Sequence, residues 1–297
     1  MFLANSFVLY FNILAYINGF KGSVLTNSSR GIQHAWHFWY ALVSVLKCHA
    51  VVLVLRASPL NWALCDWSNM EKLAHEIWIF DGEPVQFLGL PFSTRMTVVR
   101  LSSGDLWVHS PIKLSESITE QMDSLGSVKY LIAPNHLHHL FLSEWIAAYP
   151  NAEVLGTSEV IKKRSDISFH ASLNNSQSYA WAPDIEEELF SGSPLMEECV
   201  FYHSSSSTLI VTDLVENFSG KDFNYWQRVV AKGVGILAPK GKMPLDWCLS
   251  FMFGKADARK HLNRLLSWNP QILVMAHGEI VTENADKFLQ KSFKWLV

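Results

Sequence analysis

Three imidazoles directly after an apolar run are the sequence feature that most restricts this fold. The run Val128–Ala133 is typical of a buried strand, and His136, His138 and His139 all lie within residues 134–139. Imidazole nitrogens bind zinc, iron or manganese, and a loop at a strand end can direct several of them at one point. Without a metal, three buried imidazoles would each need a separate hydrogen-bond partner. The sequence therefore predicts a strand that carries a metal-binding loop to a sheet edge.

The composition indicates a chain with a large core. Of 297 residues, 49% are hydrophobic and 17% are charged, which excludes a disordered protein and suits a layered α/β or sandwich architecture. The formal net charge is −3, with both signs interspersed. Because no basic stripe is present, we expect no nucleic acid partner. The partner expected with the function given below is a small-molecule substrate. The oligomeric state stays open.

The cysteines give a weak indication of compartment. Cys48, Cys65, Cys199 and Cys248 stand far apart and form no Cys-x-x-Cys pair. This spacing argues against a structural zinc knuckle and against a dense disulfide framework. It favours a reducing, intracellular compartment.

Residues 1–70 differ in composition from the rest and form an apolar leader. The stretch Met1–Phe20 is apolar but contains three asparagines and has no Lys or Arg ahead of it, and Ala35–Leu55 is interrupted by Lys47. Neither stretch is a clean membrane span or secretory signal. Three interpretations of this leader stay open: a membrane-associated hairpin, an organelle-targeting extension, or a segment that is not part of the native folded product. Membrane association or targeting would act through residues 1–56.

The composition changes near Ser58-Pro59, and we expect one domain over residues 71–297. Its first part contains short β-rich runs separated by turns that contain Gly and Asp. We expect these runs to form successive antiparallel strands; they are Trp78–Phe80, Met96–Leu101 and Leu106–His109.

The next part of the sequence predicts two parallel strands joined by a helix. A capping box at Ser117–Glu120 predicts a helix that ends at Gly126 and leads into the strand Val128–Ala133. After the histidine loop, residues 140–149 have one apolar side, and residues 152–155 resemble another short strand. This order of strand, histidine loop, helix and strand is typical of a βαβ unit.

Three later strands each end in a candidate ligand. A His or Asp at a strand terminus can face a site above a sheet edge. The three pairs are Cys199–Tyr202 with His203, Thr208–Thr212 with Asp213, and Ile272–Ala276 with His277. We expect helices over residues 256–268 and 282–295 on either side of the last strand.

These motifs resemble a known family. In order along the chain, the histidine loop, His203, Asp213 and His277-Gly278 are similar to the ligand motifs of the metallo-β-lactamase superfamily. More narrowly, five segments resemble the uncharacterised DUF4336 family: Arg95–Leu101, Leu106–Pro111, Pro134-Asn135 with His138–Phe141, Thr208–Leu214 and Ala276–Gly278. The resemblance covers roughly residues 71–297. It implies an α/β (α+β) fold, the metallo-β-lactamase-like αββα sandwich, with an apolar N-terminal extension.

The histidine loop departs from the superfamily pattern His-x-His-x-Asp-His. When the last His of the pattern falls on His139, its second His falls on His136, its Asp on His138 and its first His on Pro134. The other register begins at His136 and leaves Leu140 and Phe141 where the pattern has Asp and His. We prefer the first register because it retains more donors.

The resemblance implies a ligand set. One metal would be held by His138, His139, Asp213 and His277, while His136 and His203 remain as an incomplete set for a second. We therefore expect one well-occupied ion, zinc first, with iron or manganese as alternatives. Asp213 and His138 are the candidate catalytic residues, since His138 stands where the superfamily has the Asp that orients water.

Three functions follow from this set. The first is a metal-dependent hydrolase that acts on an ester, thioester, amide or phosphoester through a metal-activated water. The second is a non-catalytic descendant of the fold that binds a metal or another ligand, as the changed loop suggests. The third is an iron-dependent redox protein. We interpret His109, at the end of Leu106–His109, as a structural hydrogen-bonding residue.

Overall fold

The computed structural model describes residues 69–87, 90–220, 223 and 225–296. The predicted leader lies almost entirely outside these ranges, so its three interpretations and its boundary stay predictions. Within the described ranges, none of the helices combines the length and the apolar character that crossing a bilayer requires.

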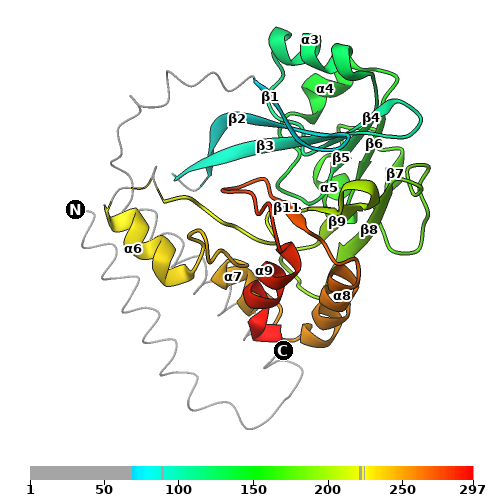
Figure 1. The fold of residues 1–297 in the computed structure, drawn as a ribbon. Coiled ribbons are helices and arrows are strands. Elements are labelled where there is room, and N and C mark those ends of the chain that lie inside the picture. The colour runs from blue at the N-terminus through cyan, green and yellow to red at the C-terminus, as the bar shows by residue number, and fades with distance from the viewer. Residues whose placement is uncertain (1–68, 88–89, 221–222, 224, 297) are drawn as a thin grey trace. The chain divides into compact units, whose positions relative to one another are not determined.

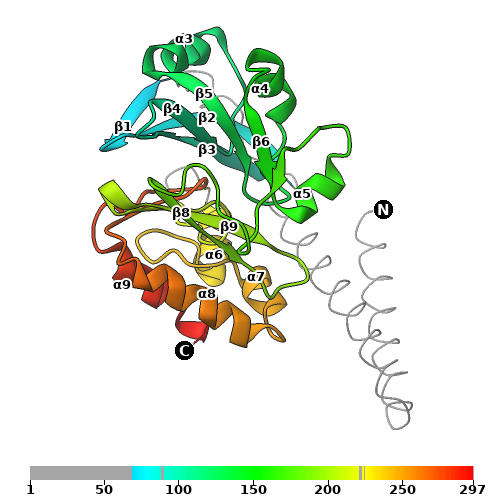
Figure 2. The same cartoon turned by 90° about the vertical axis from the view of Figure 1, so that its right-hand side faces the viewer.

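Two sheets pack face to face (Figures 1 and 2). The larger sheet has seven strands in sequence order, antiparallel from β1 to β4 and parallel from β4 to β7. They are β1 (Met70–Ala74), β2 (Ile77–Phe87), β3 (Leu90–Arg100), β4 (Asp105–His109), β5 (Ser127–Ala133), β6 (Glu153–Gly156) and β7 (Ala171–Ser172). This arrangement confirms the predicted antiparallel strands and the parallel step that follows them.

The smaller sheet has the strand order β11-β10-β9-β8. In it β10 is antiparallel to β9 and parallel to β11. The strands are β8 (Ile185–Phe190), β9 (Glu198–His203), β10 (Thr208–Ile210) and β11 (Ile272–Val274), and the one-turn helix η2 (Ser204–Ser206) joins β9 to β10.

Helices cover the outer face of each sheet, which confirms the αββα sandwich (Figure 2). Against the larger sheet lie α3 (Glu116–Leu125), α4 (Leu142–Ala148) and α5 (Ser158–Lys163). The smaller sheet is covered by α8 (Lys255–Ser267) and α9 (Ala285–Ser292), which is followed by η3 (Lys294–Leu296). The connection from β10 to α8 contains α6 (Tyr225–Val234) and α7 (Leu245–Ser250).

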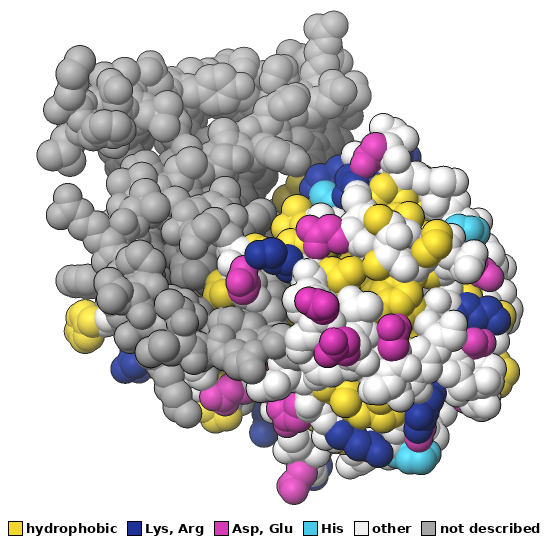
Figure 3. Space-filling model, turned by 90° about the horizontal axis from the view of Figure 1, so that it is seen from above, with side chains coloured by type: hydrophobic (Ala, Val, Ile, Leu, Met, Phe, Trp, Pro, Cys, Tyr) yellow, Lys and Arg dark blue, Asp and Glu magenta, His cyan; other side chains and the backbone are white. Residues whose placement is uncertain are grey.

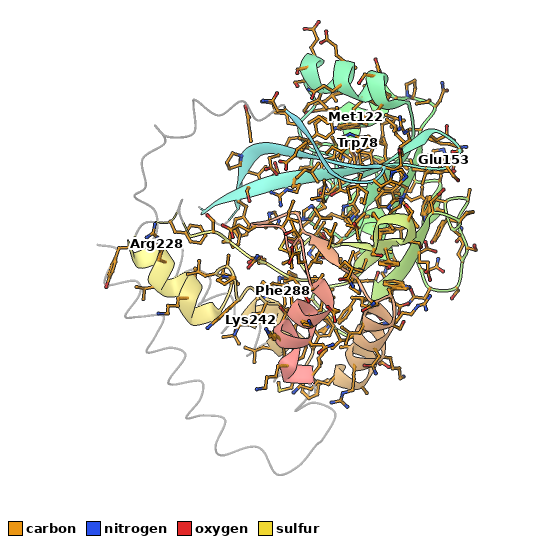
Figure 4. The ribbon with its side chains drawn as sticks, in the orientation of Figure 1. Trp78, Met122, Glu153, Arg228, Lys242 and Phe288 are labelled. Carbon is orange, nitrogen blue, oxygen red and sulfur yellow. The ribbon has the colours of Figure 1, made fainter. Side chains whose placement is uncertain are left out.

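Side chains that alternate along the strands build three apolar layers. In β2, Trp78 and Phe80 face the helices of the larger sheet, whereas Ile77 and Ile79 face the space between the sheets. Figure 4 shows Trp78 near Met122 of α3, and both belong to the outer layer. Because side chains on a strand alternate with a period of two, one sequence run contributes to two layers.

The middle layer is rich in large rings. Trp107 of β4 is fully buried and contacts Phe201 of β9 at a centroid distance of 4.8 Å and Trp181 at 6.2 Å. The edge-to-face contact between Trp107 and Phe201 joins the two sheets directly. On the outer surface that Figure 3 shows, acidic and basic side chains are interspersed.

Two expected element ends differ from the structure. The predicted capping box begins at Ser117, but Ser115 is the N-cap of α3 and accepts a hydrogen bond from the backbone N–H of Ile118. The strand expected to reach Thr212 ends at Ile210. The Val211 amide still donates to the Val274 carbonyl. From Thr212 on, the amides donate instead to a buried carboxylate, which belongs to the site described below.

Replacing Trp107 tests the middle layer. Trp107→Ala removes a fully buried ring that touches both sheets, so we expect the free energy of unfolding to fall by about 3–5 kcal/mol in urea denaturation. The control Phe253→Ala changes a ring that is 77% exposed and should stay within about 0.5 kcal/mol of the wild type. Equal losses in the two variants would contradict the packing described here.

Candidate metal centre

Two ligand candidates are placed by matched parallel strands. Ile210, the last residue of β10, pairs with Val274, the last residue of β11. Asp213 follows Ile210 and His277 follows Val274 at the same interval along the chain. Since parallel strands end at the same sheet edge, both side chains arrive at one place.

The third candidate comes from the other sheet. His138 lies in the loop after β5, beside the end of the parallel strand β4. Its Nδ1 is 2.5 Å from the Ser110 hydroxyl, and Ser110 directly follows β4. The centre therefore lies where both sheets present the C-terminal ends of parallel strands.

His138, Asp213 and His277 converge closely. The Nε2 atom of His138 is 3.1 Å from one carboxylate oxygen of Asp213, and the Nε2 atom of His277 is 3.1 Å from the other. One potential ligand atom from each residue lies within 4.8 Å of the others. The side chains are only 11%, 7% and 7% exposed, so the cluster is shielded from bulk water.

Hydrogen bonding determines which nitrogen of His277 is available. Its Nδ1 is 2.5 Å from the backbone carbonyl of Ser93, and since a carbonyl only accepts, Nδ1 must carry the proton. In the neutral ring, Nε2 then carries a lone pair. This lone pair faces a carboxylate oxygen of Asp213. Two acceptors at this distance repel unless a proton or a cation lies between them. This arrangement fits a divalent metal, whose imidazole ligands donate their second N–H to a carbonyl in the same way.

Charge and burial act in opposite directions in the cluster. Burial alone would raise the pKa of Asp213, but His138 and His277 outweigh it and hold that pKa well below its ordinary value. Burial alone would lower the pKa of His277, but the hydrogen bond and charge of Asp213 outweigh it and raise that pKa. Asp213 is therefore a carboxylate, and its negative charge favours the protonated form of His277.

A buried carboxylate shapes the loop that carries Asp213. Glu198, the first residue of β9, is fully buried. Its oxygens accept from the backbone N–H groups of Thr212 at 2.7 Å, Asp213 at 2.8 Å and Leu214 at 3.1 Å. Burial, followed by the charge of Asp213, raises the pKa of Glu198. The Val211 amide still donates to the Val274 carbonyl, so these bonds explain why the chain leaves the sheet from Thr212 on.

Asn135 joins the loops of the two sheets. Its side-chain carbonyl accepts from the backbone N–H of Leu137 and of His138 at 2.8 and 3.2 Å. Its amide nitrogen lies 2.7 Å from Asp213 and 3.1 Å from Glu198. One buried amide therefore shapes the histidine loop and also positions the carboxylate of Asp213.

The structure places two of the loop histidines outside the cluster. His139 packs against Arg164, whose guanidinium donates to the His139 carbonyl at 2.9 Å. Burial, helped by the charges of Lys163 and Arg164, lowers the pKa of His139 to about 4. His136 pairs instead with Glu159, with 2.9 Å between Nδ1 and the carboxylate. The expected set with His139 as a fourth ligand does not converge.

His203 also lies apart from the cluster. His203 is the last residue of β9, whereas Glu198, the first residue of the same strand, reaches the site. Because β9 is antiparallel to β10, the end of β9 faces the start of β10, where His203 pairs with Thr208. Its Nδ1 is 2.8 Å from the Ser206 hydroxyl.

His109, which we interpreted as structural, adjoins the site. It is 1% exposed and stacks on Trp107 at a centroid distance of 5.5 Å. Burial and then the charge of His138 lower its pKa well below the ordinary value. Its Nε2 is buried without a hydrogen-bond partner among the described residues, so the predicted hydrogen-bonding role is not realised at this atom.

The site also contains four residues that the sequence did not indicate, which are Ser93, Ser110, Asn135 and Glu198. Glu198 carried a usable signal, because an acidic residue at the start of an apolar strand lies beside the end of an antiparallel neighbour. Ser93 acts through its backbone carbonyl, and a backbone carbonyl leaves no trace in a sequence.

Solved structures show the same architecture. A metallo-β-lactamase from Pontibacter korlensis matches with a TM-score of 0.52 at 12% identity, over 77% of this chain and 98% of the other. A diflavin flavoprotein fragment from Nostoc matches with a TM-score of 0.53 at 10% identity, over 77% and 94%. The metal-soaked Flv1 flavodiiron core from Synechocystis gives 0.52 at 12%, over 77% and 60%. The chain therefore has the metallo-β-lactamase fold.

The family is narrower than the fold. The model of DUF4336, a domain of unknown function, matches residues 74–227, which is more than half of the chain. The protein belongs to the DUF4336 family. No curated protein is significantly similar to it in sequence.

Glu198 gives a test of how the Asp213 loop is held. Gln offers one acceptor where four N–H groups meet two carboxylate oxygens, so Glu198→Gln leaves buried donors unsatisfied. We expect the free energy of unfolding to fall by roughly 2–4 kcal/mol in urea denaturation. The adjacent control Glu197→Gln should change it by no more than about 0.5 kcal/mol. Similar losses in both variants would contradict the role given to Glu198.

His203 gives a pH test of its burial. Because burial lowers its pKa in the folded state, the unfolded chain takes up a proton first as the pH falls below about 6.5. The stabilisation by neutral His203 is complete above that pH and is lost as the pH falls toward the folded-state pKa. Between pH 7.5 and pH 5, His203→Gln should lose less stability than the wild type in urea denaturation. A steeper loss in the variant would refute this.

Proposed function

We propose that this protein binds one divalent metal ion through Nε2 of His138, the carboxylate of Asp213 and Nε2 of His277, and that it is hydrolytic. The observation that carries the proposal is the convergence of these three atoms, with His277 Nδ1 turned away to the Ser93 carbonyl. Three protein donors leave a fourth tetrahedral position open, as catalytic zinc sites do. Zinc is our first choice, with iron or manganese as alternatives.

Residues around the cluster explain how the protein would bind the metal ion. Asp213 brings a negative charge that offsets the charge of a cation, and Ser110 and Ser93 orient the two imidazoles. A bound divalent ion would supply Lewis acidity, which activates water and polarises a carbonyl or phosphoryl oxygen. His138 and Asp213, the candidate catalytic residues, thus act as ligands in this proposal.

The substrate proposed is a small molecule with an ester, thioester, amide or phosphoester bond. The ligand side chains are at most 11% exposed. The reacting end of a substrate must therefore be narrow, because a bulky group would displace the walls of the site. Shielding from water also strengthens electrostatic interactions inside.

Elemental analysis of the full chain, purified without chelator, tests the metal. We expect close to one ion per chain. Removal of an outer partner of a metal ligand costs about 10–100-fold in affinity, so His138→Ala or Asp213→Asn should cost at least about 100-fold. His139→Ala is the matched control and should retain the ion. A wild type without metal, or loss of metal only in His139→Ala, would refute the ligand set.

Activity assays separate the hydrolase from its alternatives. Turnover of an ester or phosphoester panel should vanish on chelation and return with zinc, manganese or iron. A full complement of metal without turnover would support the non-catalytic descendant. Two histidines with one carboxylate also suit non-haem iron, so an optical or paramagnetic iron signal after aerobic purification would favour the redox protein.

A further inference from the structure

A buried guanidinium crosses from the larger sheet to the loop that carries His277. Arg95, on β3, is only 12% exposed in its side chain. One of its nitrogens, Nη1, donates to the backbone carbonyls of Met275 at 3.0 Å and Gly278 at 2.8 Å. These two carbonyls flank Ala276 and His277, so a single donor spans the turn that presents the imidazole.

An acidic partner orients this guanidinium. Asp81 lies directly opposite Arg95 on β2. Its two carboxylate oxygens are 2.7 Å from Nε and 3.2 Å from Nη2. A bidentate pair of this kind holds the planar group in one orientation, which directs Nη1 at the two carbonyls.

The same strand also orients the His277 ring. Ser93, whose backbone carbonyl accepts from His277 Nδ1, lies two positions before Arg95 on β3. β3 thereby fixes the backbone of the His277 turn through Arg95 and its imidazole through Ser93. Gly278, with φ +98°, completes the turn, since a side chain there would strike the Asn217 carbonyl.

We propose that Arg95, oriented by Asp81, is a positioning residue that holds Nε2 of His277 in the geometry required for metal binding. The inference rests on the proposed function, because it names the residue that prepares the same site. Arg95 touches no ligand atom. It acts through the turn from Met275 to Gly278.

The chain offers a matched control on the same strand. Arg100 of β3 makes the same bidentate contact with Glu76, at 2.6 Å from Nε and 3.1 Å from Nη2. Its Nη1 donates to a single carbonyl, that of Leu125 at the end of α3, at 3.4 Å. Arg100 therefore has the same chemistry but does not contact the His277 turn.

The test compares Arg95→Lys with Arg100→Lys in the full chain. Lysine keeps the charge but lacks the planar fork. We expect Arg95→Lys to weaken zinc binding by about 10–100-fold in competition with a chromophoric chelator, whereas Arg100→Lys binds zinc like the wild type. Loaded with cobalt(II), Arg95→Lys should show a changed visible band, because the band reports ligand geometry. Wild-type affinity in Arg95→Lys, or equal weakening in both variants, overturns the proposal.

Two further measurements keep the outcome decisive. If Arg95→Lys does not fold, Asp81→Asn takes its place and should weaken zinc binding while the charge of Arg95 remains. If the wild type binds no metal, the proposed function fails, and hydrogen exchange of residues 275–281 in the metal-free protein tests the positioning role alone. Faster exchange in Arg95→Lys than in Arg100→Lys then supports it, and equal exchange overturns it.

Discussion

The buried carboxylate of Glu198 is the interaction on which the site depends most. It accepts hydrogen bonds from three successive amides just beyond β10 and shares the side-chain amide of Asn135 with Asp213. A charge with no exposure is costly unless it is fully hydrogen-bonded, and here four N–H groups satisfy it. The same contacts that make the burial tolerable also turn Asp213 toward the two imidazoles.

The strands at residues 77–80 and 106–109 were predictable because short β-rich runs between turns are a local signal. Which of their side chains face the helices and which face the other sheet was not, because residues 77–80 are all apolar and are buried on both faces of the sheet. The ends of β10 and β11 were less predictable. Apolar residues continue past Ile210 and Val274, and only a contact from a distant segment shows where pairing stops.

The site was predictable only in part, because its geometry depends on the direction in which each strand runs. Asp213 and His277 follow the ends of two strands that run in the same direction, so both reach one sheet edge. The expectation that they meet is consistent with the geometry. His203 ends β9, which runs antiparallel to β10. Strand direction cannot be read from the sequence alone. His138 and His139 are adjacent in sequence, yet Asn135 orients the loop so that one faces Asp213 and the other Arg164.

The division of the cluster between two sheets has a consequence for the whole domain. His138 belongs to one half of the sandwich, and Asp213 and His277 belong to the other, so a cation shared by all three would act as a cross-link between the halves. A ligand that binds only the folded state raises the free energy of unfolding. The increase grows as the ligand concentration rises above the dissociation constant. Metal supply in the cell would then set the lifetime of this protein against proteolysis, independently of any reaction that it performs.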